Sequence, residues 1–165
     1  MKKSVKNITG IAAAVIAAAA GFTMSSTKVT ADDNLGTAGR LYFSNGYSVA
    51  LNYADPYDAY AVQAVTDAWD SAVVEVTDWS TLIADHNTQG FEVIKDYGVG
   101  STVTIVDEYG NSTQYVCISY YSDASWYEGM TVLPDGRNAW EGDSGLWFKT
   151  CNDNGTNTVS YWMAV

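Results

Sequence analysis

Histidine, cysteine and basic side chains are scarce in this sequence. One histidine and two cysteines occur in 165 residues, too few for a closed zinc site without help from carboxylates. The first 31 residues hold four of the eight bases and none of the 19 acids, so the remainder carries a net charge of −15. Such a chain repels phosphate backbones, which excludes nucleic acid as a partner. We predict no metal and no cofactor.

Long apolar runs are equally rare, and the one present stands near the N-terminus. Residues 1–6 carry three lysines, residues 8–21 are rich in Ala, Ile and Val, and small residues follow at Val29-Thr30-Ala31. This order is typical of a secretory signal peptide, and the run is shorter than the roughly 20 residues that cross a membrane. We predict a signal peptide over 1–31 and one secreted or cell-surface domain over 32–165, a monomer with no spanning segment.

Short alternating apolar stretches make up most of the remaining chain. Asn45-Gly46 between two of them predicts a hairpin. The spacing of apolar residues from Tyr57 to Trp69, after Asp55-Pro56, predicts one helix that buries this stripe in the core. Residues 122–145 are expected to form a long loop. Further strands are predicted over 72–76, 81–84, 102–106, 113–121, 145–151 and 158–165. The absence of a strand–helix–strand rhythm favours a mostly antiparallel β-barrel or sandwich.

Two of these predicted strands end in residues that can carry chemistry. The strand from residue 145 reaches Cys151, after which Asn152 to Gly155 form a turn. The strand over 81–84 leads to His86, the single histidine. A thiol is mostly protonated at neutral pH and needs an activating base, for which an imidazole is suited. We therefore predict Cys151 as a nucleophile and His86 as its acid and base.

The second cysteine leaves an alternative open. In an oxidising compartment two cysteines commonly form a disulfide. A bond between Cys117 and Cys151 would remove the nucleophile. It would require Cα atoms within about 7 Å of each other.

The residues around both strand ends resemble those of sortases, the cell-surface cysteine transpeptidases of Gram-positive bacteria. The stretch Leu82-Ile83-Ala84-Asp85-His86, followed by Gln89-Gly90-Phe91, resembles their histidine segment, and Thr150-Cys151 ends a strand as theirs does. The resemblance implies a closed β-barrel of about eight strands with one or two short helices. It also implies that Cys151 attacks a peptide carbonyl of a surface polypeptide or cell-wall peptide, that His86 protonates the leaving amine, and that Thr150 shapes the site.

The chain departs from the sortase pattern after the cysteine. Sortases carry an arginine in the following strand, whereas no arginine or lysine follows Cys151 here. Loss of one oxyanion donor typically costs about a hundredfold to a thousandfold in rate. Arg137, in the preceding loop, is a candidate substitute. The alternative is a degenerate sortase-fold module that binds cell-wall glycan or peptide without chemistry.

Aromatic residues in the expected long loop are candidates for substrate binding. Trp126, Tyr127 and Trp140 offer ring faces of the kind that bind sugars and peptides. The same rings could instead fill the mouth of the barrel. The turn at residues 152–154 has oxygen atoms that suit calcium, but it lacks an ordered run of acids, and a solvated turn is favoured.

Gly142-Asp143-Ser144-Gly145 matches the nucleophile segment of chymotrypsin-like serine proteases, with His86 as their histidine. The domain is shorter than a double barrel normally requires, and Asp-Ser-Gly is an ordinary turn sequence. A serine hydrolase that uses Ser144 is therefore the third hypothesis, after the transpeptidase and the binding module.

Overall fold

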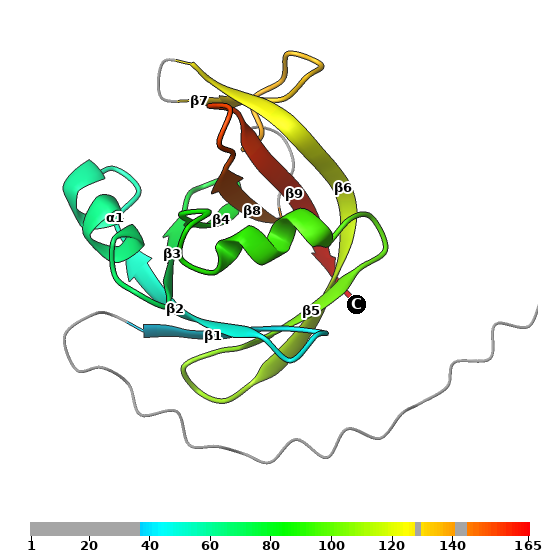
Figure 1. Cartoon of the computed structure of the whole chain (residues 1–165). Helices are drawn as coiled ribbons and strands as arrows, with labels where there is room; N and C mark the ends of the chain where they lie inside the picture. The colour runs from blue at the N-terminus through cyan, green and yellow to red at the C-terminus, as the bar shows by residue number, and fades with distance from the viewer. Residues whose placement is uncertain (1–36, 128–129, 141–144) are drawn as a thin grey trace, which may run out of the picture. The chain divides into compact units, whose positions relative to one another are not determined.

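The computed structural model describes residues 37–127, 130–140 and 145–165. Most of this part of the chain is strand (Figure 1). The strands are β1 (Thr37–Phe43), β2 (Ser48–Ala54), β3 (Ser71–Val76), β4 (Thr81–Asp85), β5 (Thr102–Val106), β6 (Ser112–Tyr127), β7 (Met130–Val132), β8 (Leu146–Cys151) and β9 (Asn157–Ala164). The helices are α1 (Ala59–Thr66) and the 3₁₀ helix η1 (Phe91–Asp96).

Eight of the strands close into a barrel, which confirms the predicted fold class. Their order is β5-β1-β2-β3-β4-β8-β9-β6, and β6 pairs back with β5 to complete the ring. β7 is an extra strand on the far end of β6. Most neighbours are antiparallel, but β2 with β3 and β4 with β8 run parallel. The second parallel pair sets the site, because it brings the ends of β4 and β8 to the same edge.

The strands β8 and β9 are buried on both faces. Phe148 and Trp162 face the barrel interior, where their ring centroids lie 4.9 Å apart. Trp147 and Val159 face outward into a second apolar cluster formed with the segment after β6. Each such fully buried large side chain contributes roughly 1.5–3 kcal/mol of transfer free energy. Burial on both faces explains why β8 reads as an apolar run rather than as strict alternation.

The segment 122–145 is more regular than predicted. β6 continues to Tyr127 and pairs there with β7, so the expectation of one long loop is wrong over these residues. Register shifts between Cys117 and Ser119 and between Tyr121 and Ala124 let this long strand bend around the barrel. The bend carries the end of β6 toward the outer face of β8.

The helix α1 lies outside the barrel beside β3 (Figure 1) and is shorter than predicted. Asp58 caps it by accepting hydrogen bonds from the backbone N–H groups of residues 60 and 61. Val65 is its buried residue, whereas Tyr60 is 90% exposed and Trp69 is 75% exposed. The prediction that the whole apolar stripe enters the core is therefore wrong. Because α1 has only about two turns and lies on the outside of the barrel, little apolar surface is available to cover its apolar stripe.

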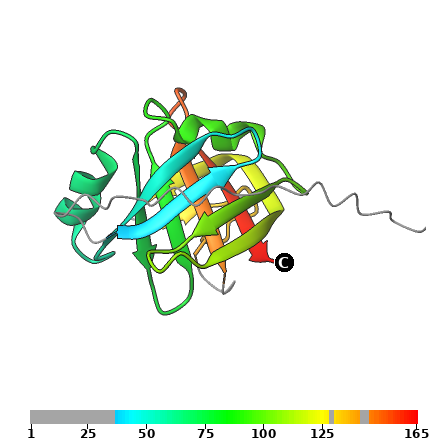
Figure 2. The ribbon, with the colours of Figure 1, turned by 90° about the horizontal axis from the view of Figure 1, so that it is seen from below.

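The 3₁₀ helix η1 lies across one end of the barrel (Figure 2). It inserts Phe91 and Ile94 into the core, where both are fully buried. Phe91 contacts Phe148 edge to face, with ring centroids 5.7 Å apart. This contact fixes the segment after His86 against the strand that ends in Cys151.

Candidate functional site

The predicted nucleophile and base lie side by side at the ends of two parallel strands. Asp85 of β4 is the register partner of Thr150 of β8. The next residue on each strand is His86 and Cys151, so both side chains emerge at the same edge. Strand alternation turns them to the outer face of the barrel, opposite to the inward-facing Ile83 and Phe148.

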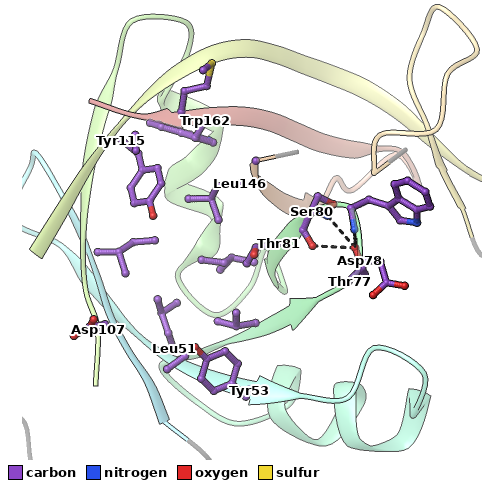
Figure 3. A pocket seen from close by; sticks show the side chains of 18 residues that line it. Leu51, Tyr53, Thr77, Asp78, Ser80, Thr81, Asp107, Tyr115, Leu146 and Trp162 are labelled. Carbon is purple, nitrogen blue, oxygen red and sulfur yellow. Dashed lines mark hydrogen bonds between the residues drawn. The ribbon is translucent and has the colours of Figure 1, made fainter. Parts of the chain in front are cut away.

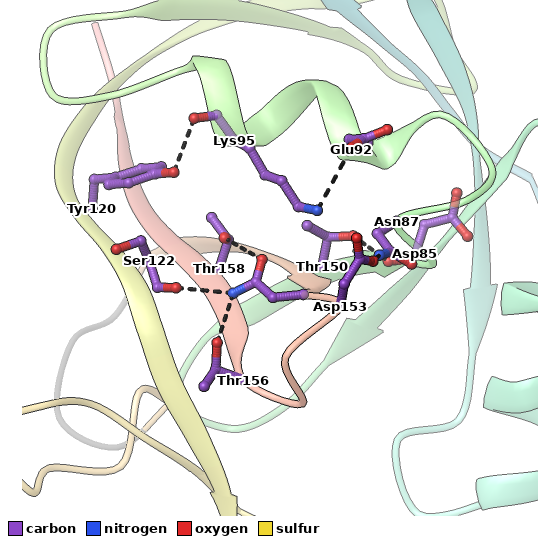
Figure 4. Close-up of polar contacts among 11 residues, drawn as sticks. Asp85, Asn87, Glu92, Lys95, Tyr120, Ser122, Thr150, Asp153, Thr156 and Thr158 are labelled. Carbon is purple, nitrogen blue, oxygen red and sulfur yellow. Dashed lines mark hydrogen bonds and ion pairs between the residues drawn. The ribbon is translucent and has the colours of Figure 1, made fainter.

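Two hydrogen bonds bracket this pair. Before it, Thr150 Oγ1 donates to the backbone carbonyl of Asp85 at 2.9 Å, in a buried position. After it, Asn87 Nδ2 donates to Asp153 Oδ1 at 2.8 Å (Figure 4). The two strand ends are thus joined on either side of Cys151 and His86. Rigid support of this kind holds catalytic groups in a fixed relative position.

The turn after Cys151 is held by its own polar side chains (Figure 4). Asn152 Nδ2 donates to the carbonyl of Ser122 at 2.9 Å and to Thr156 Oγ1 at 2.9 Å. Its Oδ1 accepts a hydrogen bond from Thr158. The side-chain amide of Asn152, which the sequence indicated as a candidate calcium ligand, is therefore already hydrogen-bonded within the protein. Among the described residues, no group of three or more His, Cys, Asp or Glu side chains is placed to hold a metal ion.

A carboxylate that the sequence did not reveal contacts the imidazole. Asp67, at the C-terminal end of α1, lies with Oδ1 3.0 Å from His86 Nε2. Gln63, one turn earlier, donates to the same oxygen at 2.7 Å. The hydrogen bonds from His86 and Gln63 lower the pKa of Asp67. An ionised Asp67 only accepts, so Nε2 carries a proton and Nδ1 is the nitrogen left to exchange protons.

A groove of about 480 Å³ runs past this pair on the outer face of the barrel. Its volume falls in the range of roughly 300–1,000 Å³ that is usual for ligand sites. α1 lines one side through residues such as Ala59 and Val62, and Trp126 and Trp140 line it from the β6 side. Cys151, His86 and Thr150 line it as well. The geometry therefore joins the predicted nucleophile, the predicted base and two of the predicted aromatic residues in one groove.

The floor of the groove holds two charged residues that sequence reasoning did not connect with the site. Lys149 and Glu75 come from β8 and β3 and both line the groove. Lys149 Nζ lies 4.1 Å from the ring centroid of Trp126, a cation–π contact. Burial lowers the pKa of Lys149, and attraction to Cys151 and then to Glu75 only partly opposes this shift. Burial raises the pKa of Glu75, and attraction to Lys149 only partly opposes it. Strand alternation could have indicated Lys149, since it shares a face with Cys151.

Comparisons with solved structures find sortases. Sortase E1 from Streptomyces coelicolor, solved with a tripeptide in its active site, aligns with a TM-score of 0.57 at 11% identity, over 79% of this chain and 88% of that one. Sortase A from Corynebacterium diphtheriae gives 0.55 at 11% identity, over 79% and 61%. A sortase C from Clostridium perfringens, with the C-terminal cell wall sorting motif, gives 0.53 at 10%, over 81% and 72%.

The chain has a sortase fold. Neither a family model nor a curated protein matches its sequence. The likeness to sortases therefore lies in the backbone, and the roles of individual residues rest on their own geometry. In the part of the chain that the structure describes, no helix has the length and apolar character needed to cross a membrane. The predicted signal peptide over 1–31 lies outside the described residues.

Both cysteines of this sortase-fold chain are free thiols. Cys151 is exposed at the groove. Cys117 belongs to β6, which lies between β5 and β9, and its side chain is buried in the barrel core. Burial raises the pKa of Cys117 to about 11. The disulfide of the alternative hypothesis is not present, and only Cys151 is accessible to reagents at neutral pH.

The remaining candidate residues lie away from the groove lining. Arg137 Nε contacts Asp135 Oδ2 at 2.8 Å, and Nη2 donates to Tyr121 OH at 3.4 Å. Tyr127, at the end of β6, is 60% exposed. The serine hydrolase hypothesis concerned Ser144, which lies outside the described residues. The strand after the cysteine, β9, turns Asn157 and Val159 to the same face as Cys151 and Lys149.

Asp85 is a buried carboxyl directly beside the pair. Its Oδ1 accepts the backbone N–H of His86 at 2.7 Å, and its Oδ2 has no hydrogen-bond partner in the described structure. Burial raises the pKa of Asp85 to about 7, although the hydrogen bond from His86 opposes the shift. This carboxyl therefore changes charge near neutral pH.

A second cavity, of about 620 Å³, lies at the opposite end of the barrel (Figure 3). Thr81 and Leu146, the first residues of β4 and β8, line it, so it is remote from the strand ends that carry the thiol and the imidazole. Its floor is apolar and includes Trp162, and Asp78 and Asp107 also line it. None of the predicted site residues lies there.

Proposed function

We propose that this protein is a secreted or cell-surface cysteine transpeptidase or peptidase of the sortase type that acts on surface polypeptides. The observation that carries the proposal is the placement of Cys151 and His86 side by side at the ends of β4 and β8, in a groove on the outer face of a sortase-fold barrel. Two of the similar sortase structures contain peptides, one a tripeptide in the active site and the other the C-terminal cell wall sorting motif.

Acyl transfer by this pair takes place in two stages, acylation of the thiol and transfer of the acyl group to an acceptor. Cys151 passes its proton to His86 Nδ1, and the thiolate attacks a peptide carbonyl carbon, forming a C–S bond and an oxyanion. When the oxyanion collapses, the C–N bond breaks and His86 gives its proton to the leaving amine. An acceptor amine, or water in a peptidase, then attacks the thioester, its proton returns to His86, and the thiolate leaves.

Asp67 supports this cycle by holding the imidazole. Its carboxylate accepts a hydrogen bond from the Nε2–H group, which fixes the tautomer and leaves Nδ1 to exchange protons. The ionised carboxylate also attracts the positive charge that the ring carries while the thiolate forms. Both partners are partly exposed to water, at 34% for His86 and 59% for Asp67, so solvent weakens this attraction. Asp67 is therefore a positioning residue in the proposal.

The test of the proposal is capture of an acyl-enzyme. The purified chain is incubated with a pool of extended peptides, and intact mass spectrometry detects an adduct on Cys151 that hydroxylamine removes, as it removes a thioester. We expect the adduct with the natural chain and none with Cys151→Ala. His86→Ala should slow alkylation of Cys151 by iodoacetamide about tenfold or more, because the thiol loses its base. A thiol that forms no adduct and alkylates independently of His86 would overturn the proposal.

A binding module without chemistry is the second candidate. Trp126 is 56% exposed while lining the groove, which suits stacking against a peptide or a sugar. In that case cell-wall peptide or glycan would bind equally well to the natural chain and to Cys151→Ala. Trp126→Ala would weaken binding in both, and no thioester would form.

A further inference from the structure

Among the described residues that line the groove, Lys149 is the one lysine or arginine, and its placement is specific. Lys149 precedes Cys151 by two positions on β8, so both side chains lie on the same face, about 6.6 Å apart along the strand. A lysine side chain can span this separation. The ammonium is thus within reach of the sulfur and of a carbonyl carbon bound to it.

The neighbours of Lys149 hold it in this position. Trp126 covers the ammonium with its ring face at 4.1 Å, and the end of β6 that carries this tryptophan is fixed by pairing with β7. Glu75 of β3 supplies a partly buried carboxyl to the same groove. A half-buried cation that already packs on a ring binds a new anion at a lower desolvation cost than a fully hydrated cation does, because less water has to be displaced.

We propose that Lys149 is the oxyanion-binding residue of the site, which stabilises the Cys151 thiolate before attack and the oxygen that becomes negative when the thiolate adds to the substrate carbonyl. This inference rests on the proposed function of Cys151. The reaction places negative charge first on sulfur and then on the carbonyl oxygen, and a half-buried cation fixed beside the sulfur stabilises both. Burial lowers the pKa of Lys149, which shows that its side chain is partly removed from water.

Arg137 is the competing cation. Its guanidinium contacts Asp135 and Tyr121 and does not line the groove. The carboxylate of Asp135 offsets the charge of Arg137, whereas Lys149 lines the groove together with Cys151. The two residues therefore make a matched pair for an experiment, since each is removed by replacement with methionine.

The experiment compares two reagents that differ in charge. Cys151 in the purified full chain is alkylated with iodoacetate, an anion, and with neutral iodoacetamide, at pH 7 and low salt, and peptide mapping gives both rates at this residue. A cation beside the sulfur accelerates the anionic reagent selectively. We expect Lys149→Met to lower the ratio of the iodoacetate rate to the iodoacetamide rate about threefold to tenfold. Lys149→Arg should keep the ratio, and Arg137→Met should leave it unchanged.

A second variant guards against loss of folding in Lys149→Met. Glu75→Gln keeps the lysine but removes the opposing carboxylate, so the ratio should rise above that of the natural chain. High salt should reduce the ratio in the natural chain, because ions screen exposed charges. An unchanged ratio in Lys149→Met, or a loss in Arg137→Met alone, would overturn the inference. The measurement of this ratio needs no substrate. The inference about Lys149 can therefore be overturned while the dependence of thiol reactivity on His86 still supports the proposed function. Equally, the ratio can depend on Lys149 while the proposed function is overturned.

Discussion

Asn87 and Asp153 are 66 positions apart in the sequence, yet Asn87 Nδ2 donates to Asp153 Oδ1 at 2.8 Å. Each follows a candidate catalytic residue, Asn87 directly after His86 and Asp153 two positions after Cys151. Their hydrogen bond joins the segments that follow β4 and β8, beyond the point where the two strands stop pairing. The relative position of thiol and imidazole therefore depends on loop side chains as well as on the sheet.

Replacing Asn87 by Ala should loosen the pair without unfolding the barrel. We expect about a twofold to fivefold slower reaction of Cys151 with iodoacetamide, and a loss of stability of about 1 kcal/mol or less, because the bond is exposed. Alkylation kinetics and urea unfolding measure the two effects. Asn111→Ala is the matched control, since Asn111 Nδ2 makes a similar exposed bond to Asp107 at 2.9 Å far from the site. Equal alkylation rates in both variants would contradict the prediction.

The buried bond between Thr150 and the Asp85 carbonyl should contribute mainly to stability. Thr150→Val keeps the shape of the side chain but removes the donor, leaving a buried carbonyl without this partner. We expect a loss of about 1–3 kcal/mol in the free energy of unfolding, measured in urea. Thr150→Ser keeps the hydroxyl and should lose less. If serine and valine destabilise equally, the effect comes from packing and not from the hydrogen bond.

Asp67 should affect thiol reactivity while leaving stability almost unchanged. Asp67→Asn keeps the size of the side chain but removes the negative charge beside His86 Nε2. A neutral amide stabilises a protonated ring less than a carboxylate does, so the thiolate–imidazolium pair becomes less populated. We expect the alkylation rate of Cys151 near pH 6.5 to fall about threefold to tenfold. Gln63→Ala, which removes the other contact to Asp67, should have a smaller effect in the same direction.

Asp85 should make the stability of the protein fall as the pH rises from about 4 to about 7. The pKa of Asp85 is about 7 in the folded state, against 3.8 for an unperturbed aspartate. Between these values the folded state binds the extra proton, so the unfolding free energy decreases as pH increases. The contribution is most favourable below about pH 4 and is lost above about pH 7.

The variant Asp85→Asn isolates this effect, because it stays neutral at every pH. We expect it to match the natural chain near pH 4 and to be more stable at pH 8 by about 2–4 kcal/mol, where the natural carboxylate is buried and charged. Urea unfolding at pH 4, 5, 6, 7 and 8 gives the difference curve. A difference that does not change with pH would show that Asp85 is not buried as a titrating carboxyl.

Local patterns in the sequence determined much of this protein. Alternating apolar residues and turn signals located most of the strands, because burial of one face and the chemistry of turns act over a few residues. The same patterns placed Cys151 and His86 at strand ends. The helical stripe from Tyr57 to Trp69 gave a wrong prediction of burial in the core. Periodicity shows that one face of a helix is apolar, but it does not show that another element covers that face.

The tertiary structure decided which residues share the site. The parallel pairing of β4 with β8 sets the histidine beside the cysteine, and the position of α1 brings Asp67 to the imidazole ring. The bend in β6 places Trp126 over Lys149, 23 positions later in the chain. These contacts join segments that are distant in the sequence, and their geometry follows from closure of the barrel. No short-range pattern encodes that closure, so only the folded chain assembles the groove and its charges.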